Sequence, residues 1–461
     1  MRRAAFVLAF GLAGFATVVA GPALAQDRWV EADRRIAALL ADPAKPVSGV
    51  TVIVLADGRE VFATAHGKAV IDPADPARER PLTLDSVVRV ASISKLPVGM
   101  AAMKLVEEGR LDLDADLSGL LGFPFRNPHY PDRAITPRML LAHTSSLRDG
   151  AVYALPVQHT LEELVRPNGP FDADGTRWAK PEAGQDRGPG AFFTYTNLNY
   201  GVLATVLERI TGERFDVTVE RLILRPAGIA GAFDVRRLDD DAFARLAPLY
   251  RLVDGAWSAR VDDLRGVRPD GMVSPFGVAA TQPLSAYAPG RNGTTLSPQG
   301  GLRASTRDLA RLLRMMIGRG AIDGTTVLKH GTMDAMLAPQ WIYDPAANGG
   351  AGNGDSYHGL MRQYGLGVHC TRHEGGPGAG DRWIDATDGP RLCGHFAEAY
   401  GLFGGLFFAP REGWGFVYLI TGTSAAETEA ASTVSTLTVW EAAIAGAVLH
   451  GLGRDGMTKS P

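Results

Sequence analysis

The chain has 461 residues, of which 47 are Lys or Arg and 50 are Asp or Glu, so its formal net charge is −3 at pH 7. This mild acidity, without a block of basic residues, argues against nucleic acid as a partner. Hydrophobic residues make up 46% of the chain, enough to bury a large core in one large domain or in two lobes. No cluster of His and Cys has the spacing of metal ligands, so we expect neither a metal nor another cofactor.

The first 25 residues have the pattern of an export signal. Arg2 and Arg3 precede an apolar run over residues 4–20, and Ala23-Leu24-Ala25 supplies a small-x-small cleavage pattern. We expect cleavage after Ala25 and a periplasmic or secreted product without a membrane span. The alternative is an uncleaved anchor, because the apolar run nearly reaches the length that crosses a bilayer.

The N-terminal part of the remaining chain predicts a helix, a hairpin and a second helix. Residues 27–41 have an amphipathic pattern, and residues 50–56 and 59–66 read as two strands joined by Asp57-Gly58. Residues 82–90 lead into a helix that contains Ser92 and stops near Gly109.

From there to about residue 300 the pattern predicts short helices and long loops. The polar segments 166–190 and 236–293 lack clear periodicity and are expected to be insertions or lids. The C-terminal part predicts a helix over 306–317, an alternation of strands and turns through 364–369, 395–408 and 415–421, and a final helix over 433–449.

The chain has two cysteines, Cys370 and Cys393. In an exported protein two cysteines favour a disulfide, and the Gly-rich segment 374–380 lies between them. We therefore predict a structural disulfide, and the alternative is a pair of buried thiols.

Ser92-Ile93-Ser94-Lys95 is the strongest chemical signal in the sequence. Three-residue spacing at the start of a helix places the Ser92 hydroxyl and the Lys95 amine on one face. There the amine can take the serine proton and create an acylating nucleophile. The amine must be desolvated for this, since an exposed lysine is protonated at neutral pH. The alternative for Ser92 is a serine that satisfies backbone donors of the helix.

Two further elements follow in order: Tyr195-Thr196-Asn197, and a Gly- and aromatic-rich strand that contains Gly394-His395. This order resembles that of the penicillin-recognising serine hydrolases, in the branch of class C β-lactamases, D,D-peptidases and family VIII esterases. Three more segments look like those of the same branch: Leu140–Leu147, Arg225–Ile229 and Ser297–Thr306.

The resemblance implies a β-lactamase/transpeptidase-like fold of the α/β (α+β) class, with residues 26–455 as the hydrolase domain. An antiparallel sheet flanked by the terminal helices would form one lobe, over about 26–90 and 300–455. An inserted helical lobe would span about 91–300. The site would lie at their junction, where the two polar insertions would wall the acyl pocket.

The same resemblance implies roles for the motif residues. Ser92 would be the nucleophile, Lys95 its base and Tyr195 a second proton carrier, which takes the Ser92 proton and later passes it on. Asn197 would hold Lys95 and a substrate amide, because its side chain offers both a donor and an acceptor. The backbone N–H groups of Ser92 and Glu398 would form the oxyanion hole.

The third motif, His395-Phe396-Ala397, departs from the pattern of the family. The family has Lys or His at the first of these positions, Thr or Ser at the second and Gly at the third. His395 keeps a basic residue, but Phe396 removes the hydroxyl expected to bind a substrate carboxylate. Ala397 replaces a Gly that lets substrate lie close to the strand, and Glu398 brings a negative charge. These changes favour neutral esters or amides over β-lactams and peptide C-termini, although His395 alone is ambiguous because it titrates near neutrality.

The sequence thus predicts an exported serine hydrolase that cleaves small esters or amides through an acyl-enzyme on Ser92. One alternative is a D-alanyl-D-alanine carboxypeptidase or β-lactamase that acts on D-amino-acid peptides or their mimics. The other is a non-catalytic ligand-binding relative. His143 is expected to be a buried structural histidine, and the oligomeric state stays open.

Overall fold

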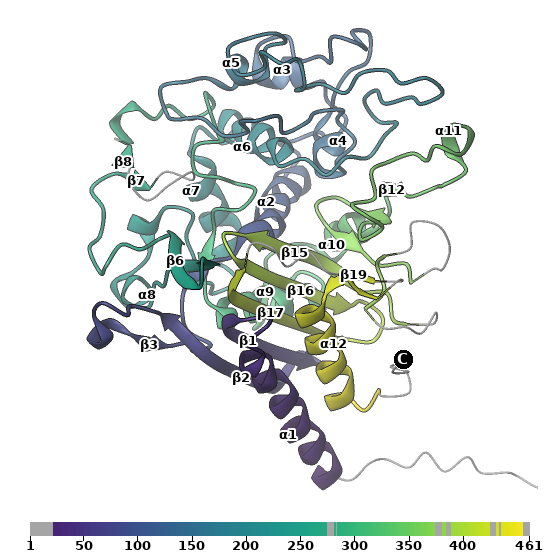
Figure 1. The fold of residues 1–461 in the computed structure, drawn as a ribbon. Coiled ribbons are helices and arrows are strands. Elements are labelled where there is room, and N and C mark those ends of the chain that lie inside the picture. Colours follow the sequence, from purple (N-terminus) through teal and green to yellow (C-terminus); the bar gives the residue numbers. More distant parts are fainter. Residues whose placement is uncertain are drawn as a thin grey trace, which may run out of the picture.

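The computed structural model describes residues 22–273, 281–282, 284–373, 380–383, 389–424, 430–432 and 435–454 (Figure 1). The expected signal peptide lies outside these residues except at its end, where helix α1 (Pro22–Ala38) begins and runs through Ala25. No helix among the described residues combines the length and the apolar character that crossing a bilayer requires.

A central sheet organises the molecule, with strand order β12-β13-β14-β15-β16-β17-β1-β2-β3 and antiparallel pairing along this path. The N-terminal hairpin therefore pairs with strands from the C-terminal half of the chain, through β1 and β17. The strands of this path are β1 (Val47–Ala56), β2 (Arg59–Val70), β3 (Arg80–Pro81), β12 (Trp341–Ile342), β13 (Gln363–Tyr364), β14 (His369–Cys370), β15 (Cys393–Ala399), β16 (Leu402–Ala409) and β17 (Trp414–Ser424).

The middle of the sheet is covered on both faces, and β1 shows why. Nine of its ten residues are buried, so its apolar side chains contribute to two cores. Val50 and Val52 pack in the core beneath α1 and α12, whereas Ile53 and Leu55 pack in the larger core on the opposite face. Such a strand, apolar on both faces, is typical of a sheet that lies between two layers of helices.

Helices α1 and α12 lie side by side on one face of the sheet, and α9 packs on the other against β1, β16 and β17 (Figure 1). Helices α2 to α6 lie above the sheet in the view of Figure 1. The helices after α1 are α2 (Lys95–Glu107), α3 (Leu117–Leu121), α4 (Pro137–Leu141), α5 (Leu161–Val165), α6 (Leu198–Thr211), α7 (Phe215–Val219), α8 (Asp240–Ala244), α9 (Thr306–Ile317), α10 (His330–Leu337), α11 (Ala347–Gly350) and α12 (Val439–Gly451).

Several short strands pair outside the main path. They are β4 (Val88–Arg89) with β9 (Arg303–Ala304), β7 (Met272–Val273) with β8 (Thr281–Gln282), β10 (Ala321–Ile322) with β11 (Thr325–Thr326), and β18 (Ala430–Ser432) with β19 (Ser435–Thr438). Strand β5 (Leu249–Val253) joins the main sheet in parallel with β17 and pairs with β6 (Ala256–Val261).

The fold class is as predicted, a mixture of helices and antiparallel sheet. The expected hairpin is β1–β2, and Asp57 and Gly58 form its turn with φ of 49° and 71°. The helix over 306–317 is α9, which begins with a capping box between Ser305 and Asp308.

Two details of the sequence prediction were wrong. The final helix starts at Val439, because Ser435–Thr438 pairs with β18 and the Thr438 hydroxyl then caps α12. Strands β5 and β6 fall inside the segment 236–293, which had shown no periodicity. Their attachment to the end of β17 is a long-range pairing that the local pattern does not reveal.

Cys370 and Cys393 form the predicted disulfide. They are directly paired residues of β14 and β15, so the bridge ties the first residue of β15 to its neighbouring strand. Strand β15 also carries His395 and Glu398, which places the bridge next to the candidate site in the chain.

We expect the double variant Cys370→Ala/Cys393→Ala to lose about 3 kcal/mol of unfolding free energy, because the bridge closes a loop of 23 residues. Urea unfolding of the variant, and of the wild type with and without reductant, measures this loss. Two free thiols in the unreduced, unfolded wild type, or equal midpoints in all three samples, would contradict the bridge.

Candidate active site

Ser92 lies where the chain passes from the small β4–β9 sheet into helix α2. Ala91 has a φ of 45°, which turns the chain out of β4 into the short 3-10 helix η3 (Ala91–Ser94). Helix α2 follows at once and is buried from Lys95 to Met103. Ser92 itself is half-buried and lines a cavity of about 780 Å³.

The Lys95 amine is fully buried beside Ser92 and has three neighbours. Its Nζ lies 3.0 Å from Ser92 Oγ, 2.9 Å from Asn197 Oδ1 and 2.9 Å from the Gln299 carbonyl oxygen. The last two atoms can only accept hydrogen bonds. A neutral amine has two N–H donors, which these acceptors occupy, so its lone pair is left for the Ser92 hydroxyl.

Asp149 fixes the orientation of the Asn197 side chain. Its carboxylate accepts from Asn197 Nδ2 at 2.9 Å and from the Leu198 backbone N–H at 2.8 Å. Because Nδ2 points to Asp149, Oδ1 of the same amide must face Lys95. Asp149 therefore holds both the start of α6 and the acceptor that binds the amine.

Burial lowers the pKa of Lys95 to about 7, and the negative charge of Asp149 opposes this shift. About half of the protein then carries a free amine at neutral pH, and this fraction rises as the pH increases. The arrangement meets the requirement stated from the sequence, a desolvated lysine next to a serine.

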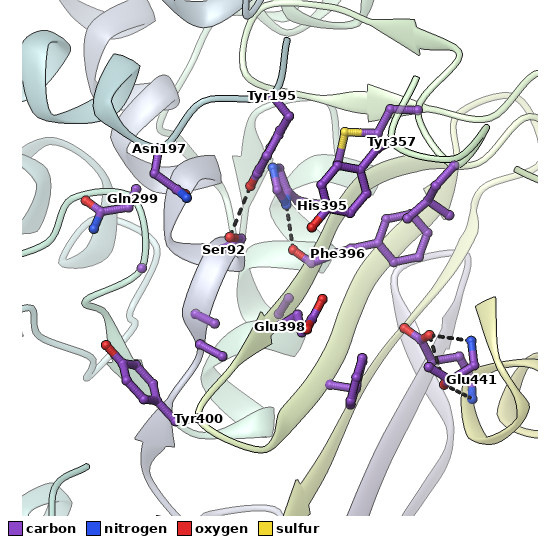
Figure 2. A pocket seen from close by; sticks show the side chains of 18 of the residues that line it. Ser92, Tyr195, Asn197, Gln299, Tyr357, His395, Phe396, Glu398, Tyr400 and Glu441 are labelled. Carbon is purple, nitrogen blue, oxygen red and sulfur yellow. Dashed lines mark hydrogen bonds between the residues drawn. The ribbon is translucent and has the colours of Figure 1, made fainter. Parts of the chain in front are cut away.

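Tyr195 borders Ser92 on another side, and its hydroxyl donates to Ser92 Oγ at 3.1 Å (Figure 2). Burial raises the pKa of Tyr195 well above its ordinary value, so the phenol is protonated at neutral pH. The geometry therefore favours Lys95 as the group that accepts the serine proton and Tyr195 as a donor.

His143 holds the Tyr195–Asn197 segment and does not reach Ser92. Its Nδ1 accepts from the Thr196 backbone N–H at 3.1 Å and lies 3.1 Å from Asn199 Nδ2. Burial and the Lys95 charge lower the pKa of His143, which keeps the ring neutral. These contacts agree with the structural role expected from the sequence.

The third motif lies on β15, which packs against η3 and so brings its backbone beside Ser92. His395 is buried, its Nδ1 lies 2.6 Å from the Phe396 carbonyl, and its Nε2 lies 3.0 Å from the Tyr364 hydroxyl. This pattern assigns the proton to Nδ1. Burial and the Lys95 charge lower the pKa of His395, so it is neutral and does not supply the positive group that a basic residue could offer.

The remaining residues of the motif alternate across the strand. Ala397 is buried although it lines the cavity, whereas the side chains of Phe396 and Glu398 lie on the other face of the strand and also line the cavity (Figure 2). The Phe396 ring stacks on Trp383 with centroids 5.3 Å apart and lies 4.5 Å from that of Phe407. An aromatic cluster thus stands where the family pattern has a hydroxyl.

The cavity walls differ from those expected. No described residue of the segments 166–190 or 236–293 lines the cavity. Part of the wall is formed by residues of the loop after α11 and of the β19–α12 segment: Tyr357, His358, Leu360, Met361, Thr436, Thr438 and Glu441. Described residues include no group of three or more His, Cys, Asp or Glu side chains that could hold a metal ion.

The roles of three site residues were not predicted from the sequence, although one of them, Gln299, lies in the family-like segment Ser297–Thr306. Gln299 acts through its main-chain carbonyl, which any residue could supply. Asp149 and Tyr364 lie in segments without a motif, and only the folded chain brings them to Asn197 and His395.

We expect a fluorophosphonate that labels nucleophilic serines to react faster as the pH rises, with a midpoint near pH 7 from the Lys95 amine. Asp149→Asn removes a charge that raises the Lys95 pKa, so its midpoint should move to lower pH. Asp355→Asn serves as the matched control, because Asp355 is not among the charges that act on Lys95. A midpoint unchanged or raised in Asp149→Asn would contradict this assignment.

Sequence comparison identifies several relatives, two of which are named for an activity. Protein Rv1367c of Mycobacterium tuberculosis is 30% identical over 262 residues, 54% of this chain and 58% of its own length. The D-alanyl-D-alanine-carboxypeptidase/endopeptidase AmpH of Escherichia coli is 31% identical over 189 residues, 40% of this chain and 45% of its own length. Esterase EstB of Burkholderia gladioli is 31% identical over 191 residues, 39% of this chain and 45% of its own length. The chain thus matches about half the length of these relatives.

The fold is similar to that of the octameric penicillin-binding protein homologue from Pyrococcus abyssi. The TM-score is 0.60 at 21% identity, over 93% of this chain and 79% of that chain. The sequence model of the Beta-lactamase family matches residues 32–437. Because this match covers most of the sequence, the chain belongs to the Beta-lactamase family.

Proposed function

We propose that this chain is an exported serine hydrolase that cleaves small esters or amides through an acyl-enzyme on Ser92. The observation that carries the proposal is the buried Lys95 amine, 3.0 Å from Ser92 Oγ, with its two N–H donors already occupied. Members of this family are serine hydrolases, and its relatives EstB and AmpH are an esterase and a peptidase.

In the proposed mechanism, Ser92 Oγ attacks the carbonyl carbon while its proton passes to Lys95 Nζ. The backbone N–H groups of Ser92 and Glu398 stabilise the oxyanion. Tyr195 donates its proton to the leaving group as the bond to the carbonyl carbon breaks, and the Lys95 ammonium restores that proton. Water then attacks the acyl-enzyme with the same groups in reverse order.

The lining of the cavity favours neutral or non-anionic substrates. His395 is neutral, Phe396 has no hydroxyl, and Glu398 is acidic. A D-alanyl-D-alanine carboxypeptidase is the second candidate, supported by the similarity to AmpH, but its substrates end in a carboxylate. The complete network around Lys95 argues against a non-catalytic binding role, since binding alone does not require it.

Export and domain organisation belong to the same proposal. Residues 1–25 have the signal-peptide pattern, which supports a location in the periplasm or outside the cell. We retain one hydrolase domain over 26–455, with a sheet lobe from both chain ends and a helical lobe over about 91–300.

We expect purified wild type to hydrolyse p-nitrophenyl butyrate and Ser92→Ala to lose more than about 1,000-fold in kcat/KM. Ser94→Ala is the matched control, because Ser94 Oγ accepts from the Leu302 backbone N–H and lies outside the proposed chemistry. Circular dichroism checks that both variants fold. Equal activity of Ser92→Ala and wild type would exclude the acyl-serine mechanism.

We also expect benzylpenicillin to be a poor substrate, because His395 is neutral and the substrate carboxylate would face that of Glu398. Hydrolysis of benzylpenicillin and of p-nitrophenyl butyrate by the same preparation gives the comparison. Efficient turnover of the penicillin would refute the preference for non-anionic substrates.

A further inference from the structure

The described part of the cavity is lined by one arginine and two glutamates: Arg89, Glu398 and Glu441. Arg89 is 2% exposed, donates from Nε to the Gly300 carbonyl at 2.9 Å, and lies over the Tyr400 ring. Glu441 is buried and accepts from the Tyr418 hydroxyl and from Thr438. Both side chains thus have partners in the fold, although Arg89 Nη1 is buried without a hydrogen-bond partner.

Glu398 differs from these two residues. It is exposed, and its carboxylate makes no hydrogen bond or ion pair within the described chain. Burial raises the pKa of Glu398, and the charge of Arg251 opposes this shift. Figure 2 shows the Glu398 side chain pointing into the pocket, on the same side of β15 as Phe396 and near Ser92. A ligand in the cavity therefore meets a carboxylate that has a free hydrogen-bonding capacity.

Other carboxylates add to the negative potential on this side of the cavity. The pKa of Tyr357 is raised by burial and by the charges of Glu398, Asp355 and Asp149. Aromatic rings stand around the same space: those of Phe396, Phe403, Tyr357 and Tyr400 line the cavity together with Glu398. Carboxylates and ring faces are the groups that attract ammonium ions in proteins.

We propose that Glu398 makes this site selective for substrates that carry an ammonium group close to the scissile ester or amide. The proposal rests on the proposed serine hydrolase function. An ammonium ion would supply the partner that the carboxylate lacks, whereas a substrate carboxylate would be repelled by it. Glu398 is thus a specificity residue, while its backbone N–H has the separate role of an oxyanion donor.

The test uses two pairs of esters of equal shape that differ by one permanent charge. Butyrylcholine and 3,3-dimethylbutyl butyrate place the difference on the alcohol side. Ethyl 4-(trimethylammonio)butyrate and ethyl 5,5-dimethylhexanoate place it on the acyl side. For each pair, acid release at pH 8 gives the ratio of kcat/KM for the cation to kcat/KM for the neutral ester. This ratio does not depend on the folded fraction of a preparation.

We expect wild type to prefer the cation in at least one pair, and Glu398→Gln to lower that ratio about tenfold, the effect of one nearby carboxylate in a partly solvated site. Glu412→Gln is the matched control, since Glu412 is an exposed residue between β16 and β17. It should leave both ratios as in wild type.

Ratios for Glu398→Gln within about twofold of wild type in both pairs would overturn the selectivity while leaving the hydrolase function intact. If wild type hydrolyses none of the four esters and Ser92 is not labelled by the fluorophosphonate, the hydrolase function fails and the selectivity with it.

Discussion

The arrangement of this site depends on one buried amine held by two acceptors. Asn197 Oδ1 and the Gln299 carbonyl take the two N–H donors of Lys95 and leave its lone pair for Ser92. Burying a charged lysine is costly, so the folded chain shifts this group toward its neutral form. Asp149 limits the shift and orients Asn197, which keeps the pKa of Lys95 at about 7 and not far below it.

The changes in the third motif form a consistent set around this amine. A neutral His395 adds no positive charge next to Lys95, and its Nε2 is engaged with Tyr364. Phe396 extends an aromatic cluster that includes Trp383 and Phe407 into the wall of the cavity. Glu398 is left as the exposed charged group on that strand. Together these residues replace a surface suited to anions by one that is aromatic and acidic.

The sequence predicted the parts of the site that are encoded by residue type at short spacing. Ser92, Lys95, Tyr195 and Asn197 converge, although Lys95 and Asn197 are 102 residues apart. The sequence could not predict the role of Gln299, because this residue contributes a main-chain carbonyl and lies 204 residues from Lys95. Nor could it predict the role of Asp149, whose carboxylate meets the Asn197 amide only in the folded chain. The same limit explains the missed pairing of β5 with β17 and the misplaced walls of the cavity, because both arise from long-range packing that local periodicity does not record.

The most direct test of the account is the pKa of the Lys95 amine itself, measured without any substrate. Protein labelled with ¹³C and ¹⁵N in its lysines can be titrated by NMR at the Cε and Nζ nuclei, and Lys95→Arg identifies the Lys95 signal. The account predicts one lysine with a midpoint at about pH 7, well separated from the rest. A Lys95 midpoint near the ordinary value of about 10 would contradict the neutral base on which the mechanism depends.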